Sequence, residues 1–196
     1  MTSVSNADGA VAFSGAVLCG GASTRMGTDK ALLEVAGEAM ARRVADALWA
    51  AGATEVLAIG GDGASLRALG LSTRPDGHAG AGPLAATVTA LEQSTPGLVL
   101  VVACDLLHPH PASMTRTIEA LHEQPDALGA IPALDGHRQW THAAWRTRAA
   151  EPLGAAFAAG IRSVHQAAAS LPLVVVRGLN ADAMSDADTP QDLTES

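Results

Sequence analysis

Residues 98–105 read Leu-Val-Leu-Val-Val-Ala-Cys-Asp, and this stretch decides the fold. An unbroken apolar run rich in valine, without alternating polar positions, is typical of a strand buried on both faces of a parallel sheet. It predicts a central strand over 98–103. A carboxylate, Asp105, follows almost at once, so a charged group is expected just beyond the end of that strand.

Shorter apolar runs on either side predict the remaining strands, at 13–19, 55–59, 71–74, 127–132, 139–145 and 173–176. Helical patterns lie between them, at 39–51, 83–92, 111–122 and 149–159. Alternating strands and helices favour parallel strands joined by crossover helices, and therefore a three-layer α/β domain with a mostly parallel central sheet. We expect a short flexible lead-in at 1–11 and a single domain over 12–194.

Composition limits the classes of function. The chain has 196 residues, 48% of them hydrophobic, and a formal net charge of −8, which argues against a surface for nucleic acid. No apolar stretch approaches the roughly 18 residues that span a bilayer, and residues 1–10 do not resemble a secretory signal, so we expect a cytoplasmic protein without a membrane partner. Cys19 and Cys104 are expected to be buried thiols, with one disulfide as the alternative.

A glycine-rich loop follows the first predicted strand, between Gly20 and Lys30. Glycines at 20, 21 and 27 allow backbone N–H groups to approach a phosphate closely, and Ser23, Arg25 and Lys30 add side-chain donors. The spacing matches neither the P-loop nor the dinucleotide-binding fingerprint. The glycines alone are compatible with either a phosphate-binding loop or a solvated surface turn. The two cations, Arg25 and Lys30, favour a phosphate-binding loop.

Asp105 is the second candidate, because parallel sheets bind ligands beyond the carboxyl ends of their strands. A carboxylate there has to be solvated, paired or bound to a metal. One carboxylate together with phosphate oxygens and water is a usual environment for Mg²⁺. A helix cap or a turn residue ahead of Pro109 and Pro111 is the alternative for Asp105.

Five segments of the chain resemble, in order, the motifs of one known family of enzymes. Residues 18–37 (LCGGASTRMGTDKALLEVAG) resemble the signature loop LxGGxSxRMGxDKxLLxxxG. Residues 82–85 (GPLA) match a GPLAG element with Ala86 in place of its last glycine, and 104–111 resemble CDxPxxxP with Leu107 in place of a proline. Residues 159–164 resemble AGxRSV, and 186–193 (DADTPQDL) resemble NxNTPEDL with two aspartates replacing asparagines.

These are the motifs of the MobA-like nucleotidyltransferases, and the chain resembles that family over roughly residues 13–193. The resemblance implies a Rossmann-like nucleotide-diphospho-sugar transferase fold. The molybdenum-cofactor members of the family transfer GMP from GTP to molybdopterin or Mo-molybdopterin, with Mg²⁺, giving pyrophosphate. Arg25, Lys30 and Asp105 are then the expected catalytic residues, and Asp105 the expected metal ligand. The implied nucleotide-binding residues are Leu18, Cys19, Gly20, Gly21, Ser23, Arg25, Lys30, Asp76, Gly82, Pro83 and Leu84, with Asp76 near the guanine base.

Less specific assignments follow from the same resemblance. Asp186 and Asp188 are either a second contact to Mg²⁺ or a solvated acidic turn. Arg138 and His142 are candidates for contact with the acceptor. The alternatives for function are transfer of another nucleotide, such as CMP, transfer to another phosphorylated acceptor, and a non-catalytic partner that binds nucleotide or cofactor. Transient contact with molybdenum cofactor biosynthesis proteins or molybdoenzyme chaperones is compatible with any of these.

Overall fold

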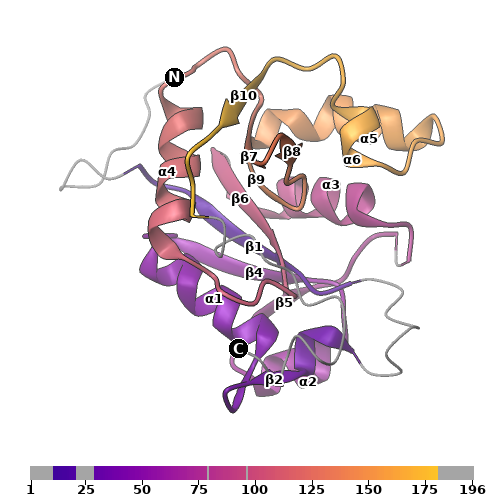
Figure 1. The fold of residues 1–196 in the computed structure, drawn as a ribbon. Coiled ribbons are helices and arrows are strands. Elements are labelled where there is room, and N and C mark those ends of the chain that lie inside the picture. The colour runs from indigo at the N-terminus through magenta and orange to yellow at the C-terminus, as the bar shows by residue number, and fades with distance from the viewer. Residues whose placement is uncertain (1–10, 21–28, 79, 96, 181–196) are drawn as a thin grey trace.

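The structure is a computed structural model that describes residues 11–20, 29–78, 80–95 and 97–180. Its centre is one large sheet with strand order β10-β7-β9-β6-β1-β4-β5, and β8 pairs with β7 outside this path (Figure 1). The strands of this sheet are β1 (Ser14–Leu18), β4 (Glu55–Ile59), β5 (Ser72–Arg74), β6 (Leu98–Ala103), β7 (Gly129–Leu134), β8 (His137–Arg138), β9 (His142–Arg146) and β10 (Leu173–Val176).

The predicted central strand lies at the middle of the sheet. β6 pairs in parallel with β1, with Leu18 opposite Ala103, and β1 pairs in parallel with β4. β9 is the exception: it runs antiparallel to both β6 and β7, and it begins at His142 rather than at 139. The expected mostly parallel sheet is confirmed, and β9 places its first residue, not its last, at the edge where β6 ends.

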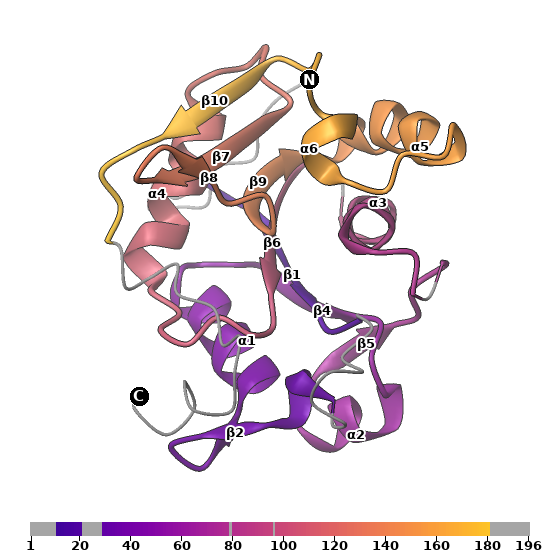
Figure 2. The same ribbon diagram turned by 45° about the vertical axis from the view of Figure 1, so that its right-hand side comes forward.

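Helices cover both faces of the sheet, which gives the predicted three layers (Figures 1 and 2). α1 (Met40–Ala50) and α4 (Pro111–His122) pack on one face, and α3 (Pro83–Gln93), α5 (Ala150–Ala158) and α6 (Val164–Ala167) pack on the other. α1 illustrates why these helices pack against the sheet, because its buried residues Met40, Val44 and Leu48 repeat at helical spacing and form one apolar face. Gly52, with φ of 95°, follows its end, where a left-handed conformation favours glycine.

Smaller elements complete the described ranges. β2 (Glu34–Val35) and β3 (Glu38–Ala39) form a separate two-stranded hairpin, and the 3₁₀ helix η1 (Lys30–Leu32) precedes it. α2 (Gly63–Ala68) follows β4, and the 3₁₀ helix η2 (Thr147–Ala149) precedes α5. No helix within these ranges is both long enough and apolar enough to cross a membrane.

A close contact between β7 and β9 gives a stability prediction. Gly129 lies opposite Trp145, which is fully buried, and a Cβ atom at position 129 would lie 2.7 Å from Cε3 of the indole. Replacing Gly129 by alanine is expected to lower the free energy of unfolding by about 1–3 kcal/mol, because a buried ring has little room to move. Chemical denaturation measures the change. Gly154→Ala in α5, where the nearest atom would be at 3.7 Å, is the control without a clash, and it is expected to raise the free energy of unfolding by about 0.5–1 kcal/mol because alanine favours a helix. Equal stability of the two variants would contradict this packing.

Candidate active site

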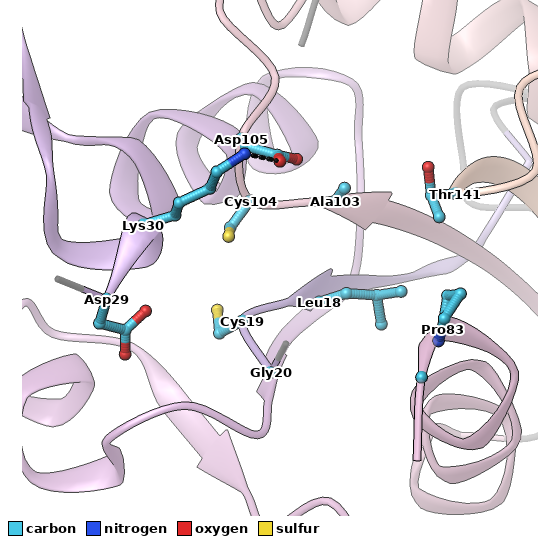
Figure 3. Close-up of a pocket in the computed structure, with 11 residues that line it drawn as sticks. Leu18, Cys19, Gly20, Asp29, Lys30, Pro83, Ala103, Cys104, Asp105 and Thr141 are labelled. Atoms are coloured by element: carbon cyan, nitrogen blue, oxygen red, sulfur yellow. Dashed lines mark hydrogen bonds and ion pairs between the residues drawn. The ribbon is translucent and has the colours of Figure 1, made fainter. Parts of the chain in front are cut away.

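The carboxyl ends of β1 and β6 lie side by side and floor a cavity of about 320 Å³ (Figure 3). Parallel strands end at the same edge of a sheet, so residues 75 or more positions apart in the sequence meet there. The lining residues are Leu18, Cys19, Gly20, Asp29, Lys30, Gly82, Pro83, Ala103, Cys104, Asp105 and Thr141. The structure therefore brings together seven of the residues predicted from the sequence: Leu18, Cys19, Gly20, Lys30, Gly82, Pro83 and Asp105.

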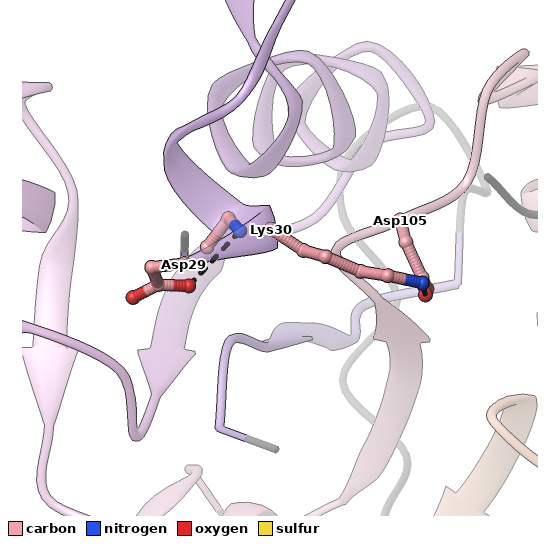
Figure 4. Close-up of polar contacts among 4 residues, drawn as sticks. Asp29, Lys30 and Asp105 are labelled. Carbon is pink, nitrogen blue, oxygen red and sulfur yellow. Dashed lines mark hydrogen bonds and ion pairs between the residues drawn. The ribbon is translucent and has the colours of Figure 1, made fainter. Parts of the chain in front are cut away.

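An ion pair links the start of η1 to the end of β6 across this cavity. Lys30 Nζ lies 3.0 Å from Asp105 Oδ2, and the two side chains are 21% and 23% exposed. Asp29 fixes the position of Lys30, because its carboxylate accepts a hydrogen bond of 3.1 Å from the Ala31 N–H and caps η1 (Figure 4). Lysine and carboxylate thus face the same partly exposed space, where an incoming phosphate could reach both.

The N-terminus of α3 closes the opposite side of the cavity. Gly82 precedes the helix with φ of 93°, a conformation that favours glycine, and Pro83 occupies the first turn. Helix N-termini present free N–H groups and a partial positive charge, which suits phosphate. The Leu84 side chain is fully buried in the core behind this turn, so only its backbone is available to a ligand.

Asp76 lies next to this cavity rather than in its lining. Its Oδ1 accepts hydrogen bonds from the His78 N–H at 3.1 Å and from the Thr89 hydroxyl at 3.3 Å. The other oxygen, Oδ2, faces Gly20: a Cβ atom there would lie 3.8 Å from it and 3.6 Å from Gly60 Cα. The loop that carries Asp76 is therefore packed against the end of β1, with one carboxylate oxygen directed toward Gly20.

Cys19 and Cys104 lie at neighbouring strand ends, with their sulfur atoms on the same side of the cavity floor (Figure 3). Both are buried free thiols, which confirms the predicted thiols over a disulfide. Hydrogen bonding with the Cys19 thiol, together with burial, raises the pKa of Cys104 well above its ordinary value. A thiol that stays protonated is a poor nucleophile, so Cys104 forms part of the cavity floor rather than a reactive centre.

The remaining predicted residues lie elsewhere. Gly21, Ser23, Arg25, Asp186 and Asp188 fall outside the described residues. His142 is 3% exposed and faces α4, beside Ser113 and Met114. Arg138 is exposed on β8 and does not line the cavity between β1 and β6.

Four lining residues lie outside the predicted set: Asp29, Ala103, Cys104 and Thr141. The first three stand within two positions of Lys30 or Asp105 in the sequence, whereas Thr141 is distant from both. Its carbonyl accepts a hydrogen bond of 2.9 Å from the Ala103 N–H, which holds it beside the end of β6. Only the antiparallel direction of β9 puts it there. The sequence signal was a strand near 139–145, and that signal does not reveal strand direction.

A metal ion fits the site through one protein carboxylate. The described residues contain no group of three or more histidine, cysteine, aspartate or glutamate side chains that could form a cage for a metal. Asp29, the other carboxylate of the lining, caps η1, whereas Asp105, with Oδ2 shared with Lys30, suits a hard cation such as Mg²⁺ that takes its other ligands from substrate phosphates and water.

Comparison with known proteins defines the class. A crystal structure described as molybdopterin-guanine dinucleotide biosynthesis protein A from Archaeoglobus fulgidus superposes with a TM-score of 0.77, covering 93% of this chain and 95% of that one; at 22% identity it shows the fold. A probable molybdenum cofactor guanylyltransferase of Deinococcus radiodurans is 31% identical over 92% of this chain and 91% of its own length. One of Pelotomaculum thermopropionicum is 48% identical over 47% of this chain, a segment that spans only 44% of that relative.

Fold and sequence together define a nucleotidyltransferase. The MobA-like NTP transferase domain matches residues 15–172. The chain belongs to the MobA-like NTP transferase family.

Proposed function

We propose that the protein transfers GMP from GTP to molybdopterin or Mo-molybdopterin, giving molybdopterin guanine dinucleotide and pyrophosphate. The names of the relatives from Deinococcus and Pelotomaculum support the substrates. The single observation in the structure that carries the proposal is the Lys30–Asp105 pair at the adjoining ends of β1 and β6, inside a cavity that the N-terminus of α3 also faces.

The reaction requires the protein to position the two substrates and to stabilise the negative charge on their phosphates. An oxygen of the acceptor's phosphate attacks the α-phosphorus of GTP, the bond to the bridging oxygen breaks, and pyrophosphate leaves with the electron pair. The nucleophile is already anionic, so no general base is required. Lys30 neutralises charge on the triphosphate, and Arg25 is assigned the same role by the family's motif. Gly20 and the first turn of α3 offer backbone donors to phosphate oxygens.

Asp105 would hold Mg²⁺ in this scheme. Bound there with the phosphates, the ion would offset the negative charge that builds up on the transferring and departing groups. Lys30 Nζ lies 3.0 Å from Asp105 Oδ2, so lysine and metal would compete for, or divide, the two oxygens of this carboxylate. Asp186 and Asp188 are proposed as a further metal contact or as a solvated turn.

Asp76 is proposed to select guanine. A carboxylate accepts hydrogen bonds from both the N1–H and the exocyclic amine of guanine, and adenine offers no such pair of donors. The hydrogen bonds from His78 and Thr89 hold Oδ1 in place, which leaves Oδ2 directed toward Gly20. Transfer of CMP is the competing assignment, and it would leave the roles of Lys30 and Asp105 unchanged.

Pyrophosphate release tests the proposal. Purified protein is given Mg²⁺ and molybdopterin with GTP, CTP, ATP or UTP at equal concentration. We expect release with GTP and little with the other three. A preference for CTP would overturn the role of Asp76. No release with any nucleotide, from folded protein that binds Mg²⁺, would exclude this transferase activity and favour a non-catalytic binding partner.

A further inference from the structure

A second cavity lies at the carboxyl edge of the sheet, on strands that the proposed reaction does not use. It has a volume of about 350 Å³ and is lined by Ala133, Asp135, Gly136, Arg138, Val175, Arg177 and Gly178. These residues come from the ends of β7 and β10 and from the hairpin between β7 and β8 (Figure 2). β7 runs in the same direction as β6, because each is antiparallel to β9, so both cavities open at one edge.

Strand register explains why two arginines flank this cavity. Arg138 on β8 is paired with Ala133 on β7. On the other side of β7, Val176 is paired with Pro132, so the next residue, Arg177, falls beside Ala133. Residues paired across neighbouring strands project from the same face of a sheet. The small Ala133 side chain thus forms a floor between two long cationic side chains.

The hairpin holds Arg138 firmly in this position. Asp135 and Gly136 both have left-handed backbone conformations, with φ of 46° and 83°, as a two-residue hairpin turn requires. The guanidinium of Arg138 lies 5.7 Å from the centre of the Trp140 ring, and that ring packs against His165. The contact with Trp140 supports the arginine from behind and leaves its edges free to donate hydrogen bonds.

The charge of this cavity is opposite to that of the whole protein. Two arginines and one aspartate line it, whereas the chain carries a net charge of −8. Across the residues that the structure describes, neither guanidinium is held by an ion pair or a hydrogen bond. Arg116 lies behind the cavity and donates a hydrogen bond of 3.2 Å to the Gly178 carbonyl, which fixes the chain just after Arg177. Two guanidinium groups outnumber the single carboxylate of Asp135 in this small hollow, and such an excess of positive charge suits an anion.

Distance decides which anion this is. Neighbouring strands are about 5 Å apart, and β7 lies two strands from β6, so this cavity is about 10 Å or more from Asp105. A phosphate cannot bind both places at once. An acceptor whose phosphate reaches the Lys30–Asp105 site would extend past Thr141 toward β7 and bring its far end to the arginines.

We propose that Arg138 and Arg177 form a second anion subsite, which binds an anionic group of the acceptor at the end away from its nucleophilic phosphate. In molybdopterin this group is the deprotonated dithiolene, or the metal-oxo group that it carries. The identity of the acceptor rests on the proposed function. The binding of an anion by the two arginines does not, and can be measured without turnover.

Inorganic phosphate is the probe for the binding test, followed by nuclear magnetic resonance of the three tryptophan indole N–H groups. Phosphate is expected to shift the signal of Trp140, which Arg138 contacts, and to leave that of buried Trp145 in place. Arg177→Gln is expected to weaken this binding by about fivefold to tenfold. Arg67→Gln is the matched control, because it removes the same charge from an exposed arginine on α2.

The kinetic test uses the same variants with GTP and molybdopterin. Arg177→Gln and Arg138→Gln are expected to raise the KM for molybdopterin by about fivefold to tenfold and to leave the KM for GTP unchanged. A phosphate-dependent shift of Trp140 that survives Arg177→Gln would overturn the subsite. Loss of that shift with no change in the KM for molybdopterin would overturn the assignment to the acceptor and indicate a site for free anions. If no nucleotide supports turnover, the proposed function fails, and the phosphate titration still decides the subsite.

Discussion

Replacing Asp105 by asparagine is expected to lower the turnover number by about 10²- to 10³-fold. Asparagine keeps the size of the side chain and removes the negative charge that we assign to Mg²⁺ and that pairs with Lys30 at 3.0 Å. Because both side chains are partly exposed, the free energy of unfolding should change by about 1 kcal/mol or less. Steady-state pyrophosphate release and chemical denaturation separate the two effects.

Asp46→Asn is the control for this variant. This variant also removes the carboxylate of an ion pair, in which Asp46 Oδ1 lies 2.7 Å from the Arg42 guanidinium. Asp46, however, lies on the surface of α1, and its side chain is 42% exposed. Its turnover should match that of the parent protein. Turnover of Asp105→Asn within threefold of the parent would remove Asp105 from the reaction, and a large loss in both variants would point to a general effect of charge.

Replacing Lys30 by methionine is expected to lower the turnover number and to raise the affinity for Mg²⁺. Turnover should fall by about 10²-fold or more, because the triphosphate loses a cation at the point where pyrophosphate leaves. The affinity of the nucleotide-free protein for Mg²⁺ should rise by about fivefold to tenfold, because Asp105 loses the ammonium group that shares its Oδ2. Calorimetric titration with Mg²⁺ measures the second effect.

A lysine that only stabilised the fold would not produce this pair of results. Arg42→Met, which removes the cation of the surface pair on α1, is the control and should change neither quantity. An unchanged affinity for Mg²⁺ together with low turnover would mean that Asp105 does not bind the metal in the free protein. Normal turnover would exclude Lys30 as a catalytic residue.

The central part of the fold was predictable because each element is marked by its own residues. The apolar run at 98–103 became β6 at the predicted bounds, and Pro83 and Pro111 begin α3 and α4 as expected of proline in a first helical turn. Short elements were not predicted. α2 has only six residues, and β2 and β3 have two residues each, too few for a hydrophobic period to show.

The part of the site that lies at the ends of two neighbouring parallel strands was predictable. Gly20 and Asp105 follow β1 and β6 directly, so their meeting follows from strand direction. Thr141 and Arg177 were not predicted, because their places depend on a reversed strand and on the pairing of β10 with β7. The sequence around Thr141 and Arg177 contains no local pattern that predicts how strands distant in the sequence pair. His142 shows the reverse case, since its neighbour Thr141 lines the cavity whereas its own side chain points into the core.

The separation of the two cavities along the chain has an evolutionary consequence. The two cavities are built from different stretches of chain: residues 18–105 supply most of the first, and 133–138 with 175–178 supply the second. Loops and short edge elements at the rim of a sheet tolerate substitution and insertion better than a central parallel strand. Descendants of such a sequence could therefore exchange one acceptor for another by rewriting a few positions at the rim, while the ancestral chemistry on the nucleotide is inherited intact.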